Sequence, residues 1–227
     1  IAEIVKNNGL DFGFSYDGDA DRIMLVNANG IVLDGDYIIY LIGKDLKQKG
    51  KLNNNCVIGT VMTNLGLKKA LEIENINFIE TAVGDKYVMR EIDLQKASVG
   101  GEQSGHIILP EILPTGDGIL TSVYLSKMFV SNPLLLEELE SGVKKFPQIL
   151  VNLKVEDKEK VMSSTELKDF IEEEEEKIKG KGRVLVRASG TESLVRVMVE
   201  AEEEKFCQEI SKKIVDLPVF GAIIAMA

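Results

Sequence analysis

The feature of the sequence that most constrains the fold is an acidic loop placed directly after an alternating segment. Residues 11–16 alternate polar or small side chains with aromatic ones, which predicts a strand. Residues 17–22 then read Asp-Gly-Asp-Ala-Asp-Arg, so only Gly18 and Ala20 separate three carboxylates. A hydrophobic core does not tolerate three uncompensated charges. The loop must therefore lie at a surface, held on the end of a packed strand.

The three carboxylates of Asp17, Asp19 and Asp21 predict a bound cation, because carboxylates so close repel one another and raise each other's pKa. An all-oxygen set suits a hard ion, Mg²⁺ first and then Ca²⁺ or Mn²⁺. An EF-hand is excluded, since its sixth and twelfth loop positions would hold Arg22 and Ala28 in place of Gly and Glu. A solvated acidic turn stays the alternative. Arg22 weakens it, because a phosphate ester also requires a cation fixed nearby.

The bulk properties limit the classes of partner. With 227 residues, 44% hydrophobic and 28% charged, the chain has room for one large or two modest globular domains. A formal charge of −10 argues against nucleic acid and against anionic membrane surfaces. Cys56 and Cys207 lack metal-ligand spacing, which favours a reduced, cytoplasmic compartment. The apolar tail 219–227 is shorter than the roughly 20 residues that a membrane helix needs.

The periodicity predicts two kinds of architecture. Through residue 132, strand-length apolar runs alternate with helical spacing, which predicts a mixed α/β domain with a largely parallel sheet, preceded by a hairpin over 23–33. From residue 149, one strand, a helix capped by Ser163 and Glu166, two strands and a last helix predict a small α+β domain with an antiparallel sheet. The glutamates of 172–176 are interpreted as a solvated helix face. The residues after 218 predict an edge strand or disorder.

A second candidate loop reads Gly-Gly-Glu-Gln-Ser-Gly-His over residues 100–106. Its three glycines indicate a tightly bent backbone or a closely approaching ligand. Glu102, Ser104 and His106 stand on alternate positions, and the functional interpretation is a hydroxyl-binding loop in which the Glu102 carboxylate accepts hydrogen bonds from a polyol. The alternative is a glycine-rich turn whose polar groups cap local backbone. His106 is the only histidine of the chain, and its role as a proton carrier depends on its neighbours in the fold.

A third candidate loop, over residues 187–192, has the groups of an anion site that needs no metal when Arg196 further along the chain is included. Two guanidinium groups, two hydroxyls and a glycine backbone suit a phosphate. These groups belong to Arg187, Ser189, Gly190, Thr191 and Arg196. A hairpin turn with internally bonded hydroxyls is the alternative. The segment lacks the G-x-x-x-x-G-K pattern and is therefore not a nucleotide P-loop.

Taken together and in this order, the three loops resemble the metal, sugar and phosphate loops of the α-D-phosphohexomutase family. Segments 83–88 (Val-Gly-Asp-Lys-Tyr-Val) and 115–118 (Thr-Gly-Asp-Gly) are most similar to the branch that acts on glucosamine phosphates. The resemblance implies four domains in the whole protein. Residues 1–33 would be the end of domain 2 with the metal loop, 34–132 domain 3, 133–148 a linker and 149–227 domain 4.

The resemblance also implies an activity: interconversion of glucosamine 6-phosphate and glucosamine 1-phosphate through a phosphoserine enzyme and a bisphosphate intermediate. The family's phosphoserine loop has no counterpart here, so we expect an N-terminal portion to be missing and this chain alone to be inactive. Mg²⁺ would be held by Asp17, Asp19 and Asp21, with Arg22 and His106 as catalytic residues. The remaining implied residues bind substrate, namely Glu102, Ser104, Arg187, Ser189, Gly190, Thr191 and Arg196.

Two alternatives stay open. The chain could come from a phosphomannomutase or phosphoglucomutase of the same family, or it could be a non-catalytic module that binds sugar phosphates, since none of its loops visibly forms a covalent intermediate. In each case the partner is a phosphorylated hexose or hexosamine, with no nucleic acid and no membrane. A homodimer is an open alternative to a monomer.

Overall fold

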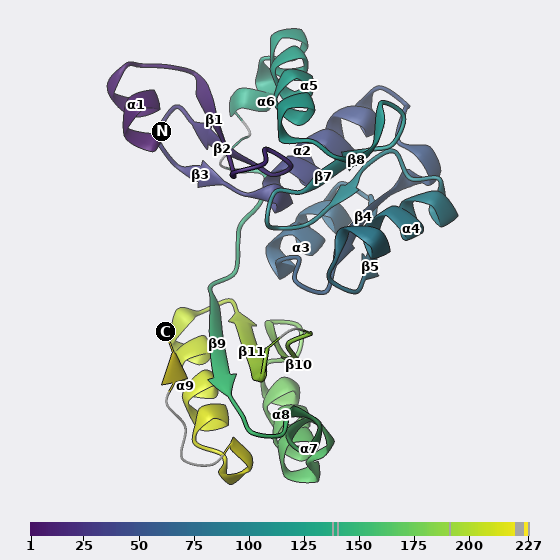
Figure 1. Cartoon of the computed structure of the whole chain (residues 1–227). Coiled ribbons are helices and arrows are strands. Elements are labelled where there is room, and N and C mark those ends of the chain that lie inside the picture. The colour runs from purple at the N-terminus through teal and green to yellow at the C-terminus, as the bar shows by residue number, and fades with distance from the viewer. Residues whose placement is uncertain (138, 140, 191, 221–224, 227) are drawn as a thin grey trace. The chain divides into compact units, whose positions relative to one another are not determined.

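The structure, a computed structural model, describes residues 1–137, 139, 141–190, 192–220 and 225–226. Contacts divide the chain into two units, Ile1–Lys145 and Phe146–Ala227, each with its own hydrophobic core (Figure 1). Within the described ranges, no helix is both long and apolar enough to cross a bilayer. The two units are described one after the other.

The first unit opens with a three-stranded antiparallel sheet in the order β1-β2-β3. Its elements are α1 (Ala2–Asn7), β1 (Phe12–Tyr16), β2 (Ile23–Asn27) and β3 (Val32–Leu33). The expected strand and hairpin are confirmed, and Tyr16 pairs with Ile23, so the acidic loop closes the β1–β2 hairpin. On α1 only Val5 is buried, whereas Ile4 is 57% exposed.

A five-stranded sheet follows in the order β5-β4-β6-β7-β8. Its strands are β4 (Cys56–Thr60), β5 (Asn77–Thr81), β6 (Gly100–Gly101), β7 (Ile107–Leu109) and β8 (Leu113–Gly116). Strand β4 runs parallel to β5 and to β6, and the β6–β7 and β7–β8 pairs are antiparallel. The α/β class is confirmed, with a mixed sheet.

Helices cover both faces of this sheet, as alternation along its strands requires. They are α2 (Gly35–Gln48), α3 (Leu65–Ile73), α4 (Asp85–Gln95), α5 (Gly118–Ser131) and α6 (Leu134–Glu137), with a short turn η1 at Asn53–Asn55. Val57 of β4 joins the core cluster formed with α2, α3 and α5, and its neighbour Ile58 joins the cluster formed with α4. The sheet is therefore the middle layer of three.

Much of the segment expected as a linker, 133–148, packs against the first unit. Leu135, Leu139 and Val143 are buried in its main core. Lys145 forms ion pairs with Asp34 and Asp36 at the start of α2. The change from one unit to the next therefore falls at residues 145–146.

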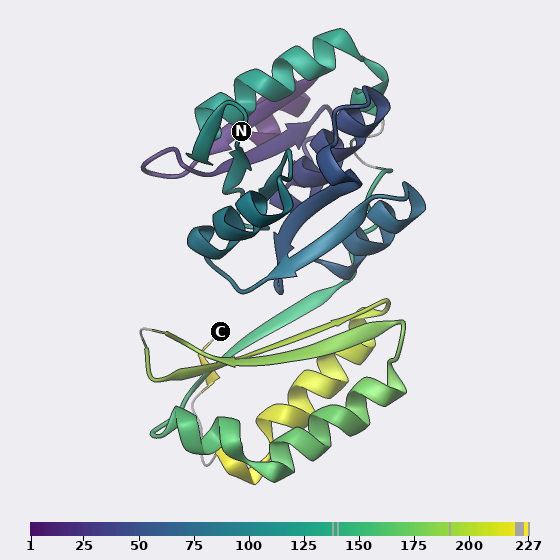
Figure 2. The same cartoon turned by 90° about the vertical axis from the view of Figure 1, so that its right-hand side faces the viewer.

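The second unit is a small α+β domain, as the sequence predicts. Its antiparallel sheet has the order β10-β11-β9-β12, and its helices lie on one face of the sheet (Figure 2). The strands are β9 (Gln148–Lys154), β10 (Gly182–Ala188), β11 (Leu194–Ala201) and β12 (Ala225–Met226). The helices are α7 (Lys158–Ser163), α8 (Thr165–Lys177) and α9 (Glu204–Val215), with a turn η2 at Pro218–Phe220. Of the two alternatives for the tail, the edge strand is found at β12.

One local expectation in α8 is wrong, and the second, a solvated glutamate face, holds for the exposed Glu172, Glu173 and Glu176 but not for Glu174. The N-cap is Ser164, whose Oγ accepts the Leu167 N–H at 3.3 Å, and Ser163 instead ends α7. Within the glutamate run, Glu174 is only 4% exposed and binds Lys177 and Lys213. Position 174 is seven residues after the buried Leu167, so it shares the buried face of the helix.

Candidate functional site

The acidic loop forms a cluster of oxygen ligands at the end of β1. One carboxylate oxygen from each of Asp17, Asp19 and Asp21 lies within 4.8 Å of the others. Asp17 and Asp19 are exposed, and Asp21 is partly buried. Its Oδ1 atom is buried and has no hydrogen-bond partner among the described residues. Three hard oxygen donors, one of them buried and unsatisfied, fit a divalent cation such as Mg²⁺.

The charges of this loop affect one another. Burial raises the pKa of Asp21, and the hydrogen bond and charge of Asp17 and the charge of Asp19 raise it further. Burial also acts to raise the pKa of Asp17, but hydrogen bonds from the Arg22 N–H and from Asp21, with the charge of Arg22, lower it overall. The Arg22 N–H lies 3.2 Å from Asp17 Oδ1. A bound cation would relieve the repulsion that these opposite shifts reflect.

The backbone of the acidic loop is held by the start of α5. Ala20 has φ +60°, a conformation that alanine rarely adopts. Its carbonyl accepts the Gly118 N–H at 2.9 Å, which fixes this turn. A Cβ atom on Gly118 would lie 2.7 Å from the Arg22 carbonyl oxygen, so the close approach requires glycine. Asp117 caps α5 by accepting the Leu120 N–H at 2.8 Å.

The structure brings the glycine-rich loop 100–106 against the acidic loop. Arg22 and His106 form a β-bridge, and the Ile23 N–H donates to the Gly105 carbonyl at 3.1 Å. Gly105 has φ +93°, and a Cβ atom there would lie 2.2 Å from the Ile23 carbonyl oxygen. Only glycine permits both this conformation and this approach. Two segments far apart in the sequence therefore form one site.

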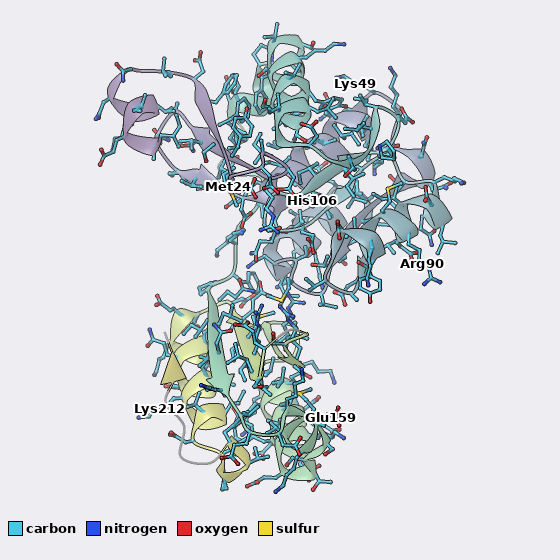
Figure 3. All side chains as sticks on the ribbon, viewed as in Figure 1. Met24, Lys49, Arg90, His106, Glu159 and Lys212 are labelled. Atoms are coloured by element: carbon cyan, nitrogen blue, oxygen red, sulfur yellow. The ribbon has the colours of Figure 1, made fainter. Side chains whose placement is uncertain are left out.

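His106 lies beside the carboxylates of the acidic loop. Its side chain is buried at the junction of the two sheets of the first unit, where Figure 3 labels it. Its Nε2 atom lies 3.8 Å from Asp21 Oδ2. A Cβ atom on Gly116 would lie 2.2 Å from the same nitrogen, so Gly116 leaves the space that the imidazole occupies. Nδ1 is buried without a hydrogen-bond partner in the described part of the chain.

Glu102 has a structural partner that the sequence did not reveal. Its Oε1 atom accepts the Gly84 N–H at 2.9 Å, which ties the loop to the turn before α4. The Gly35 N–H donates to the Gln103 carbonyl at 3.1 Å and ties the same loop to α2. Glu102 and Ser104 are both partly buried. In the sequence, the signal that could have predicted these contacts is the glycine at the start of each helix, Gly35 for α2 and Gly84 for α4.

In the second unit, two arginines face each other across β10 and β11. Arg187 pairs with Arg196 in the strand register, and like charges placed directly opposite are destabilising. Arg196 also binds Glu192 Oε2 at 3.2 Å, while its Nε atom is buried without a hydrogen-bond partner among the described residues. A bound anion would compensate the paired guanidinium groups. Thr191, the fourth predicted member of this loop, lies outside the described residues.

The backbone of this third loop is ordered by Ser189. The Ser189 N–H donates to the Leu194 carbonyl at 2.8 Å, and its Oγ accepts the Glu192 N–H at 3.3 Å. The internally bonded turn expected as the alternative is thus present together with the arginines. Lys158 of α7, which the sequence analysis missed, donates from Nζ to the Ser189 carbonyl at 2.8 Å. Gly190 is exposed, with open space around its Cα.

Comparison with known sequences identifies both units. Residues 34–146 match the pattern of "Phosphoglucomutase/phosphomannomutase, alpha/beta/alpha domain III", and residues 150–217 match that of "Phosphoglucomutase/phosphomannomutase, C-terminal domain". The chain belongs to the phosphoglucomutase/phosphomannomutase family. It is 46% identical over 217 residues to the phosphoglucosamine mutase of Bacillus cytotoxicus and 47% identical to that of Shouchella clausii. These alignments cover 96% of this chain but 48% and 49% of the relatives, so the chain spans about half their length.

Solved structures of the family share the fold. An Aspergillus fumigatus N-acetylphosphoglucosamine mutase in complex with GlcNAc-6P and magnesium has a TM-score of 0.76 at 21% identity, covering 95% of this chain and 52% of that chain. A phosphoglucomutase/phosphomannomutase family protein from Burkholderia thailandensis has a TM-score of 0.78 at 17% identity, covering 99% and 50%. At these identities, the likeness establishes the fold.

Proposed function

We propose that this chain supplies the metal, sugar and phosphate loops of a phosphohexomutase that interconverts glucosamine 6-phosphate and glucosamine 1-phosphate. The observation that carries the proposal is the bridge between Arg22 and His106, because it joins three carboxylates to a loop with hydroxyl-binding groups. The relatives at 46–47% identity are phosphoglucosamine mutases, and the Aspergillus structure contains GlcNAc-6P and magnesium. These likenesses support a phosphorylated hexosamine as the substrate class.

In the proposed reaction, a substrate hydroxyl attacks a phosphoserine carried by another part of the longer protein. The bond between phosphorus and the serine oxygen breaks, a bond to the sugar oxygen forms, and His106 accepts the hydroxyl proton. Mg²⁺ held by Asp17, Asp19 and Asp21 would supply charge neutralisation at the transferred group. The half-exposed Arg22 side chain would bind the same oxygens.

The second unit would hold the phosphate that is not reacting. Arg187 and Arg196 can each bind a phosphate oxygen pair, and Gly190 leaves the backbone open to a close approach. Binding energy at this remote phosphate positions the reacting hydroxyl. After the resulting bisphosphate reorients, its other phosphoryl group returns to the serine. Glu102 and Ser104 would bind sugar hydroxyls in both orientations.

The test is turnover of glucosamine 6-phosphate by the longer protein that carries this chain. We expect Arg187→Ala to lower kcat/KM by about 10²-fold or more, since a charge-assisted bidentate contact is lost. Arg90→Ala, on the exposed face of α4, is the matched control and should leave kcat/KM unchanged. Equal turnover by wild type and Arg187→Ala would contradict the proposal.

Two further measurements separate the alternatives. A preference for mannose or glucose phosphates over glucosamine 6-phosphate would assign the protein to another branch of the family. Binding without turnover in the longer protein would favour the non-catalytic module. We predict that this chain alone has no mutase activity, because it carries no phosphoserine loop. Cytoplasmic location and dimerisation remain predictions.

A further inference from the structure

A cavity of about 410 Å³ lies in the first unit, and none of its lining residues belongs to the acidic loop or to the glycine-rich loop. It lies between the C-terminal half of α2, the residues that follow α2, and α5. Gly35, at the start of α2, contacts the sugar loop, whereas the cavity begins ten residues later at Asp45. At 1.5 Å per residue, that separation along the helix is about 15 Å. The cavity is therefore a second concave site with its own lining.

Two residues that line the cavity carry polar groups, and one atom among them is unsatisfied. Asp45 is 1% exposed, and its Oδ2 atom accepts a hydrogen bond from Lys49 Nζ at 2.7 Å. Its Oδ1 atom is buried with no hydrogen-bond partner in the described part of the chain. Such an oxygen normally has a partner, and leaving it unsatisfied is costly. Burial, and then the charges of Asp45 and Glu111, raise the pKa of Tyr124, so its hydroxyl stays a protonated donor at neutral pH.

The walls and the rim differ in character. Apolar side chains form the walls: Leu46 and Met128 are buried, whereas Ile112 and Val123 are exposed at the mouth. Lys49, Lys51 and Lys127 are exposed and contribute three ammonium groups to the lining. Against these three positive charges, Asp45 contributes one carboxylate to the lining, so the lining is positive although the whole chain has a formal charge of −10. An apolar cleft of this volume with a few convergent polar groups is typical of small-molecule sites.

We propose that this cavity is a second ligand site that takes a small amphipathic anion. The ligand would have an apolar body against Val123 and Met128, an N–H or O–H group that donates to Asp45 Oδ1, and an anionic group near the lysines. The assignment does not depend on the proposed mutase activity, because none of these residues belongs to the three loops.

The experiment is a fluorescence titration of this chain with 1-anilinonaphthalene-8-sulfonate, which has an aromatic body, one N–H donor and one sulfonate. We expect saturable binding of one molecule per chain. Val123→Asp places a carboxylate in the cavity wall and should weaken binding by at least about tenfold through repulsion and lost apolar contact. Val130→Asp is the matched control: it lies on the same helix, is 82% exposed and is absent from the lining. It should bind the dye as wild type does.

A second probe tests the anionic group. N-phenyl-1-naphthylamine has the same aromatic body and N–H but no sulfonate, and we expect it to bind at least about tenfold more weakly, because it gains nothing from the lysines. Circular dichroism of both variants checks that the fold is retained. Equal dye binding by Val123→Asp and Val130→Asp, or equal affinity for the two probes, would overturn the proposal.

Two other occupants would also overturn it. If sedimentation shows a dimer that Val123→Asp dissociates, the cavity is an interface between two copies. If dye binding disappears when the chain is extended to the full length of its relatives, another part of the longer protein fills the cavity.

Discussion

Replacing Gly35 with alanine should destabilise the first unit, although alanine is the better helix former. A Cβ atom at position 35 would lie 2.0 Å from the Glu102 carbonyl oxygen, whereas such contacts are essentially never shorter than 3.0 Å. Helix and loop must therefore separate by roughly 1 Å. That movement lengthens the 3.1 Å hydrogen bond from the Gly35 N–H to the Gln103 carbonyl beyond its useful range.

The substitution has two free-energy costs and one free-energy gain, and their sizes can be compared. Overpacking costs about 1–3 kcal/mol, and a lost hydrogen bond costs about 0.5–1.5 kcal/mol. The gain in helix propensity from glycine to alanine is at most about 1 kcal/mol. We therefore expect Gly35→Ala to lower the free energy of unfolding of the first unit by about 1–3 kcal/mol.

The assay is hydrogen exchange with mass spectrometry in increasing urea, reading peptides of 1–145 separately from those of 146–227, so that the second unit is an internal reference. Gly43→Ala is the matched control on α2. Its Cβ atom would lie 2.9 Å from Val57 Cγ1, about 0.1 Å inside the 3.0 Å limit, so a small shift suffices and its effect should stay within about 1 kcal/mol. A Gly35→Ala chain as stable as wild type would refute the reasoning that this glycine lets α2 support the sugar loop.

Three further predictions concern the core and the charged groups. Phe129→Ala should cost the first unit about 3–5 kcal/mol in urea unfolding, because Phe129 is 1% exposed and its ring centroid lies 5.1 Å from that of Phe12 in β1; a loss below 1 kcal/mol would contradict its place in the core. Burial acts to raise the pKa of Glu174, but its lysine partners lower that pKa overall, below the ordinary value of 4.5. The ionised carboxylate therefore stabilises the folded second unit fully above pH 4.5, and this stabilisation is lost as the pH falls through the pKa of the folded state. The stability difference between wild type and Glu174→Gln should therefore shrink in acid, and a difference that grows there would oppose this sign. Arg196→Ala should weaken binding of glucosamine 6-phosphate about tenfold in calorimetry. It should change the free energy of unfolding of the second unit by less than about 1 kcal/mol, since the ion pair between Arg196 and Glu192 is partly exposed. A large loss of stability would make the role of Arg196 structural.

Local periodicity was enough to predict the elements that carry the site. The alternation over residues 11–16 predicts a strand, and the structure has β1 at Phe12–Tyr16. Neighbouring serines have similar local chemistry, so the choice of Ser163 over Ser164 as the cap of α8 could not be decided from sequence.

The contacts that assemble the site join residues far apart in the sequence, so the periodicity of the sequence could not predict them. The bridge between Arg22 and His106 depends on how the two sheets of the first unit pack. The hydrogen bond from Gly84 to Glu102 depends on two loops meeting at one edge. Lys158 lies on a helix that was not predicted, and its contact with Ser189 became visible only in the fold.

The measurement that tests the central claim most directly is a Mn²⁺ titration of this chain, followed by electron paramagnetic resonance. The claim is that Asp17, Asp19 and Asp21 form one divalent-cation site. We predict one ion per chain, with binding weakened at least about tenfold by Asp19→Asn, because one charged ligand is lost. Asp11→Asn, an exposed aspartate just before β1, should bind as wild type does. No binding by wild type, or equal binding by wild type and Asp19→Asn, would contradict the account.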